Sequence, residues 1–157
     1  MRYQPRMPGS VMAGVGQYPR HSATPVAQTD SRILGYLGRA ISLEFSAAQE
    51  YLAQAALAQT RQEIELAKRF VALANEEFHH AAILTERLAH LGALPAQSVL
   101  KATTPSNSSA EALAACEARE KEAIALYAEA TAYCTNIGAG DDARFFAQMH
   151  EEELAHL

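Results

Sequence analysis

Apolar residues from about residue 33 onward recur every three or four positions, which is the spacing of one face of an α-helix. Four such stripes predict four helices. The first helix begins at the capping pair Asp30-Ser31, and the second runs from about Gln62 to Leu91. The third begins at Ser108-Ser109 and the fourth at Asp141. The pattern therefore predicts an all-α chain.

Ionisable residues occur inside these apolar stripes. The stripes read Leu34, Leu37, Ile41, Glu44, Ala48, Tyr51, Ala55; Leu66, Phe70, Leu73, Glu77, His80, Leu84, Leu88, Leu91; Leu113, Cys116, Glu120, Ile124, Tyr127, Thr131, Cys134; and Phe146, Met149, Glu153, His156. Four carboxylates and two imidazoles are thus predicted to point into the core. Glu50 lies on another face of the first helix, and we expect it to be solvated.

The inward polar residues form an internal repeat. Both copies read Glu, six residues, Tyr, twenty-five residues, Glu, two residues, His, and they lie 76 residues apart. The first copy is Glu44, Tyr51, Glu77 and His80; the second is Glu120, Tyr127, Glu153 and His156. Glu76 and His79 also have the Glu-x-x-His spacing, but they are turned by about 100° from the stripe. The stripe and the repeat both select Glu77 and His80.

The spacing also predicts how the helices are connected. Residues equidistant from the turn of an antiparallel helix pair lie at the same height. The midpoint of Glu44 and Glu77 falls between Thr60 and Arg61, and that of Glu120 and Glu153 falls just before a Gly-rich turn at 138–140. Residues 93–108 can span about 50 Å when extended. We therefore expect two antiparallel helix hairpins joined by a long crossover.

Buried carboxylates need a counter-charge, a proton or a metal ion, because an unpaired buried charge is very costly. The inward stripes contain no Lys or Arg, so bound cations are the economical answer. Six oxygen and nitrogen ligands with mostly carboxylates suit iron or manganese better than structural zinc. Tyr51 and Tyr127 are either core residues with bonded hydroxyls or partners of the ligands, and the sequence leaves both open.

Composition and charge narrow the functional classes. Residues 1–32 have a net charge of +3 and residues 33–157 a net charge of −8, which favours attraction of cations over nucleic-acid binding. We expect no membrane partner, because no apolar run approaches the roughly 20 residues of a membrane span. The N-terminus lacks a signal-peptide core. Cys116 and Cys134 lie about 27 Å apart on one predicted helix and cannot pair within it. Free thiols suit a reducing compartment, so we expect a cytoplasmic protein.

Residues 1–30 are rich in Pro, Gly, Ser and Gln without periodicity, which predicts a disordered or extended tail. Such a tail is either a dispensable extension or a segment that docks a partner. The four-helix domain is predicted to occupy residues 31–157.

With these residues in view, the chain resembles the ferritin-like di-iron carboxylate superfamily over about residues 33–157. That superfamily has a ferritin-like four-helix bundle that holds two metal ions. Ligand order and spacing are most similar to bacterioferritin, including the long interval from His80 to Glu120 and the Leu94-Pro95 start of the crossover. The resemblance implies two iron ions, with manganese as a possible substitute. It makes Glu44 and Glu120 terminal ligands, Glu77 and Glu153 bridging ligands, and His80 and His156 ligands of one ion each.

The activity implied by this resemblance is oxidation of Fe(II) by dioxygen or hydrogen peroxide, for iron storage or detoxification. A homodimer or larger homo-oligomer is the expected assembly. One alternative is a rubrerythrin-like protein that reduces peroxide. Another is a non-catalytic helical bundle that docks onto a larger assembly.

Three departures from these families bear on the prediction. Phe78 occupies the position of the haem-ligating Met of bacterioferritins, so we predict no haem there. Rubrerythrins have an extra Glu where this chain has Ala123, Glu117 lies one turn on the wrong side, and the Cys pairs of a rubredoxin domain are missing. The fourth helix ends earlier than in cage-forming ferritins, so we expect either a truncated chain or a protein that does not close the usual shell.

Overall fold

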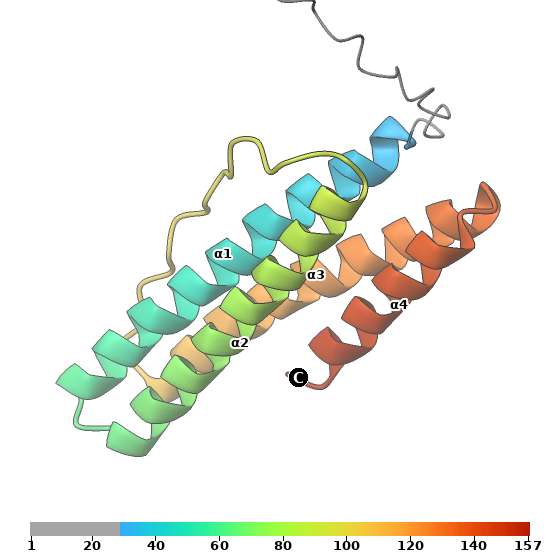
Figure 1. Ribbon diagram of the computed structural model, residues 1–157. Coiled ribbons are helices and arrows are strands. Elements are labelled where there is room, and N and C mark those ends of the chain that lie inside the picture. Colours follow the sequence, from blue (N-terminus) through green and yellow to red (C-terminus); the bar gives the residue numbers. More distant parts are fainter. Residues whose placement is uncertain (1–28) are drawn as a thin grey trace, which may run out of the picture.

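The computed structural model describes residues 29–157, and this part of the chain consists of four α-helices with no strand. Helices α1 (Ser31–Thr60) and α2 (Ile64–His90) form one hairpin, and α3 (Ser109–Asn136) and α4 (Gly140–Leu154) form the other. Residues 91–108 cross between the hairpins without regular structure (Figure 1). The predicted all-α, ferritin-like four-helix bundle is confirmed. The predicted tail lies, apart from its last two residues, outside the described residues.

Local sequence signals set the helix ends. The carboxylate of Asp30 accepts a hydrogen bond from the Arg32 amide at 2.8 Å, and the Ser108 hydroxyl accepts one from the Glu111 amide at 3.2 Å. Gly92 and Gly138 take left-handed conformations with φ of 80° and 75° and end α2 and α3. The first turn contains neither Gly nor Pro, and there Gln62 adopts a φ of 62°. This non-glycine left-handed residue explains why the sequence marked that turn poorly.

Two apolar clusters lie above and below the level of the ionisable residues. The cluster nearer the start of α1, called the upper cluster, includes Leu37, Leu84 and Phe146 and contains residues of all four helices. The other includes Tyr51, Phe70 and Cys116 and contains no buried residue of α4. Along α1, α2 and α3, the inward ionisable residues come between members of the two clusters. Within the described part of the chain, no helix is both long and apolar enough to span a membrane.

Two sequence expectations about exposure are wrong. Glu50 is fully buried, with 0% exposure, because the crossover lies over its face of α1. Leu113, expected to point inward, is 44% exposed. Helix α4 ends at Leu154, so none of its described residues lies at the height of Leu113 in the α3–α4 hairpin.

Leu84 and Leu113 give a matched test of this packing. Leu84→Ala should lower the free energy of unfolding by roughly 2–5 kcal/mol, because Leu84 is fully buried in the upper cluster. Leu113→Ala should lower it by less than about 1 kcal/mol, since that side chain is largely exposed. Denaturant unfolding followed by circular dichroism measures both, and equal losses would contradict the described packing.

Candidate metal centre

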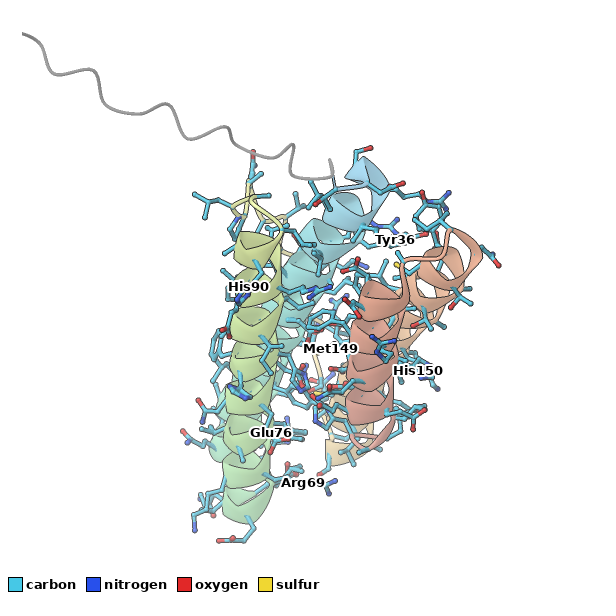
Figure 2. The ribbon with its side chains drawn as sticks, turned by 45° about the vertical axis from the view of Figure 1, so that its right-hand side comes forward. Tyr36, Arg69, Glu76, His90, Met149 and His150 are labelled. Atoms are coloured by element: carbon cyan, nitrogen blue, oxygen red, sulfur yellow. The ribbon has the colours of Figure 1, made fainter. Side chains whose placement is uncertain are left out.

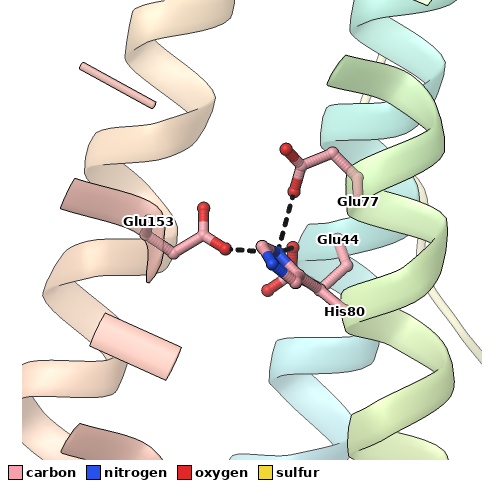
Figure 3. A group of neighbouring side chains, drawn as sticks. All are labelled: Glu44, Glu77, His80 and Glu153. Carbon is pink, nitrogen blue, oxygen red and sulfur yellow. Dashed lines mark ion pairs between the residues drawn. The ribbon is translucent and has the colours of Figure 1, made fainter. Parts of the chain in front are cut away.

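The six predicted residues lie together in the layer between the two apolar clusters. Each helix contributes at least one of them, and Figure 3 shows four converging from α1, α2 and α4. Glu44, Glu77 and Glu153 are 0% exposed, Glu120 is 1% exposed and His80 is 6% exposed. His156 is also largely shielded, although it follows the last residue of α4 rather than lying on that helix as predicted. The final turn of the chain, not the helix, therefore brings its imidazole to the centre.

These side chains form two groups that share two carboxylates. One group is Glu44, Glu77, His80 and Glu153; the other is Glu77, Glu120, Glu153 and His156. In each group the four potential ligand atoms lie within 4.8 Å of one another. Glu77 and Glu153 belong to both groups, so they occupy the positions expected of carboxylates shared between two cations.

The polar atoms of the centre lie within ion-pair distance of one another, but several of them make no hydrogen bond. His80 Nδ1 lies 2.7 Å from Glu153 Oε1, 3.6 Å from Glu77 Oε2 and 3.8 Å from Glu44 Oε2. It nevertheless makes no hydrogen bond, and neither do those three oxygens. Buried polar atoms normally have partners. Oxygen and nitrogen atoms that converge on a point without hydrogen-bonding fit a bound cation, and the predominance of carboxylates suits iron or manganese.

The second group has a similar arrangement around His156. Its Nδ1 lies 3.1 Å from Glu77 Oε1, 3.4 Å from Glu120 Oε2 and 3.8 Å from Glu153 Oε2. The rings of His80 and His156 are stacked, with centroids 5.5 Å apart and planes 13° from parallel. The two groups thus lie side by side, with both Nδ1 atoms turned toward the shared carboxylates.

Two tyrosines hold the remaining glutamates by bonds that cross between the hairpins. The Tyr51 hydroxyl on α1 donates to Glu120 Oε1 on α3 at 2.5 Å. The Tyr127 hydroxyl on α3 donates to Glu44 on α1. Each bond occupies one oxygen of its glutamate, and the other oxygen is left facing an imidazole. The sequence left the role of these tyrosines open, and the structure shows that their hydroxyls donate hydrogen bonds to the two glutamates.

Two further carboxylates contact the centre: Glu76, which the stripe argument set aside, and Glu152, which the sequence patterns did not single out. Glu76 Oε2 lies 3.1 Å from His156 Nε2, and Glu152 Oε2 lies 3.5 Å from His80 Nε2. Figure 2 shows Glu76 on the side of α2 that faces α4. Each carboxylate therefore contacts the outer nitrogen of the imidazole from the opposite hairpin. The signal was in the repeat, because both copies read Glu-Glu-x-x-His and Glu76 and Glu152 are also 76 residues apart.

Burial and mutual contact shift the proton affinities of the carboxylates. Burial raises the pKa of Glu44 to about 7 and that of Glu153 to about 9, although contact with His80 lowers both. Burial also favours protonated Glu77, but close contacts with His156, His80 and Glu44 outweigh it and lower the Glu77 pKa to about 2. Adjacent carboxylates thus differ in pKa because they cannot all ionise at close range.

The pKa values of the two imidazoles shift upward, whereas burial alone would lower the pKa of an isolated histidine. Burial alone would lower the pKa of His80, but the contacts with Glu153, Glu44 and Glu77 raise it to about 12. Contacts with Glu120 and Glu77 raise the pKa of His156 to about 10, against the effect of burial. Without a cation, both rings therefore hold a proton at neutral pH.

The positions that distinguish the related families lie outside the two groups. Phe78, at the haem-ligand position, is 43% exposed on α2 and packs near Phe45, with ring centroids 6.2 Å apart. Ala123, where a rubrerythrin would have a further Glu, is buried in the upper cluster. Glu117 is exposed and pairs with Lys121. None of these three side chains adds a ligand to the two groups.

Comparison with known proteins agrees with this architecture. A family model described as a ferritin-like domain matches residues 34–157. A structure of Rhodobacter capsulatus bacterioferritin matches with a TM-score of 0.77 and 25% sequence identity, covering 82% of this chain and 81% of that one. That bacterioferritin is described with a metal-free dinuclear site and a haem iron. The comparison with curated proteins gives no match. Since the family model spans all four helices, this chain belongs to the ferritin family of ferritin-like-domain proteins.

Proposed function

We propose that this protein binds two iron ions between its hairpins and oxidises Fe(II), in the manner of a bacterioferritin. The observation that carries the proposal is the pair of four-residue groups that share Glu77 and Glu153. Glu44 with His80, and Glu120 with His156, would complete one position each. Manganese fits the same donor set.

The shared carboxylates matter for the chemistry because they would hold two metal ions close together. Two Fe(II) ions can give one electron each to a single dioxygen, which with two protons becomes hydrogen peroxide. Two Fe(II) ions can likewise reduce one hydrogen peroxide, which with two protons becomes two waters. The buried layer between apolar clusters would limit access of bulk water. Tyr51 and Tyr127 would keep the terminal glutamates oriented, as hydrogen-bonded partners of metal ligands generally do.

Storage or detoxification of iron is the biological role that this reaction would serve. Homo-oligomers are typical of soluble proteins and are our expectation here. The two cysteines are free and buried, which supports a reducing, cytoplasmic setting. The rubrerythrin alternative loses support at Ala123, which supplies no carboxylate.

Anaerobic Fe(II) addition tests the proposal directly. We expect two Fe(II) bound per chain, followed on exposure to air or peroxide by a ferric absorbance. Glu77→Ala removes a carboxylate shared by both groups, so oxidation should slow by more than about tenfold. A roughly tenfold loss is the lower end of the effect of removing a residue that only hydrogen-bonds a metal ligand, and Glu77 is a proposed ligand itself. Glu86→Ala, on the exposed surface of the same helix, is the matched control. Fewer than one tightly bound iron per unsubstituted chain would refute the proposal.

Proton release provides a second test, because metal ligands must be deprotonated. The pKa values of His80 and His156 are raised to about 12 and about 10, so both rings carry protons that a metal ion displaces at neutral pH. Apparent affinity for Mn(II) should therefore rise with pH between 6 and 8, by about tenfold per pH unit for each proton released. Calorimetry in two buffers of different ionisation enthalpy counts these protons. A pH-independent affinity would show that the imidazoles are not displaced from their protonated state.

A further inference from the structure

A buried ion pair stands directly beside the proposed metal centre. Arg119 Nη2 lies 3.1 Å from Glu50 Oε2, and the side chains are 13% and 0% exposed. Glu50 and Arg119 immediately precede Tyr51 and Glu120, which are joined by the 2.5 Å hydrogen bond. Two polar links between α1 and α3 thus occur at consecutive residues, one inside the centre and one just outside it.

The crossover completes the environment of this ion pair. The Thr104 amide donates to Glu50 Oε1 at 3.0 Å, and Arg119 Nη2 donates to the Ala102 carbonyl at 2.7 Å. Gln54 Nε2 donates to both Glu50 Oε1 and the Thr104 carbonyl. A buried pair with this many partners is expensive to break, because removing one member leaves the other charge uncompensated.

The internal repeat shows that only one of the two tyrosine–glutamate bonds has such an ion pair beside it. A shift of 76 residues takes Glu50 to Leu126 and takes Arg119 back to Leu43. Both leucines belong to, or pack against, the upper apolar cluster. They also line a groove of about 760 Å³ beside the crossover. The tyrosine–glutamate bonds are thus duplicated, whereas the ion pair behind one of them is replaced by two leucines behind the other.

We propose that Glu50 and Arg119 are positioning residues that act through Glu120 and make the two metal positions inequivalent. The inference rests on the proposed metal-binding function and concerns the position formed by Glu120 and His156. There the ion pair fixes α1 and α3 relative to each other at the level of the ligand. Beside the position formed by Glu44 and His80, the residues related by the repeat are Leu43 and Leu126, which form no ion pair. Outer partners that orient a ligand commonly change metal affinity by about 10–100-fold.

Co(II) binding to single-position variants tests this inference. His80→Ala leaves the position of Glu120 and His156, and His156→Ala leaves that of Glu44 and His80. Arg119→Met should weaken Co(II) binding about tenfold in the His80→Ala chain and change the visible absorption of the bound ion. In the His156→Ala chain the affinity should change by less than about twofold, because the ion pair does not contact that position.

Leu43→Met is the matched control, since it places the same side chain at the position related to Arg119 by the repeat. It should leave Co(II) affinity unchanged within about twofold in both chains, because Leu-to-Met exchanges conserve volume. Glu50→Gln is the second variant if Arg119→Met fails to fold. It keeps the side-chain shape and the acceptor for Thr104 but removes the charge, and the same one-sided loss is expected.

The outcomes separate this inference from the function on which it rests. Equal losses in the two chains would show that the ion pair only holds the fold together, and would overturn the positioning role. No loss in either chain would overturn it as well. An unsubstituted protein that binds no Co(II) would refute the metal centre itself, and with it any positioning role. A loss confined to the His80→Ala chain supports the inference.

Discussion

The cost of burying carboxylates governs this structure. Four glutamates that are at most 1% exposed meet in one layer, and none of them pairs with a Lys or Arg among the described residues. An ionised carboxylate in such a place is strongly unfavourable unless something compensates it. Two imidazoles and two tyrosine hydroxyls compensate part of the charge. The oxygens that remain without hydrogen-bond partners belong to the two groups that could hold a metal ion, so the proposed cations would compensate the rest of the charge.

The apolar clusters above and below this layer determine how strongly its groups interact. They remove water, which makes each contact between charges stronger and each unpaired charge more costly. The same exclusion of water raises the pKa of Glu153 while the neighbouring imidazoles lower that of Glu77. In the absence of a cation, the layer therefore holds protons on its imidazoles at neutral pH. Metal binding as proposed would displace these protons and couple stability to metal affinity, because the fold positions groups that the metal-free protein satisfies poorly.

Much of this arrangement was predictable from the sequence because it follows helical periodicity. The stripes placed Glu44 and Glu77 on inward faces, and the repeat chose His80 over His79. What the sequence did not predict depends on contacts between distant segments. Glu50 is polar and lies off the stripe, and it is buried only because the crossover passes over it.

The remaining surprises have similar physical reasons. Glu76 and Glu152 reach the imidazoles of the opposite hairpin with long side chains, and helical periodicity assigns such residues to the solvent-facing side. Leu113 keeps the apolar spacing, but no described residue of α4 lies at its height. Periodicity describes one helix at a time, so it cannot report which neighbour covers a face or how far that neighbour extends.

The repeat also shows why an internally duplicated bundle does not have two equal halves. Two hairpins can be related by a rotation that exchanges Glu44 with Glu120 and Tyr51 with Tyr127. A single crossover runs in one direction, so its sequence cannot obey that rotation. Its residues Ala102 and Thr104 form hydrogen bonds with Arg119 and Glu50, whereas the preceding residues 97–101 border the groove by Leu43. The inner residues can stay alike because each half contributes the same set of glutamate, tyrosine and histidine side chains to the buried layer. The outer residues diverge because the connecting chain gives each half a different neighbour.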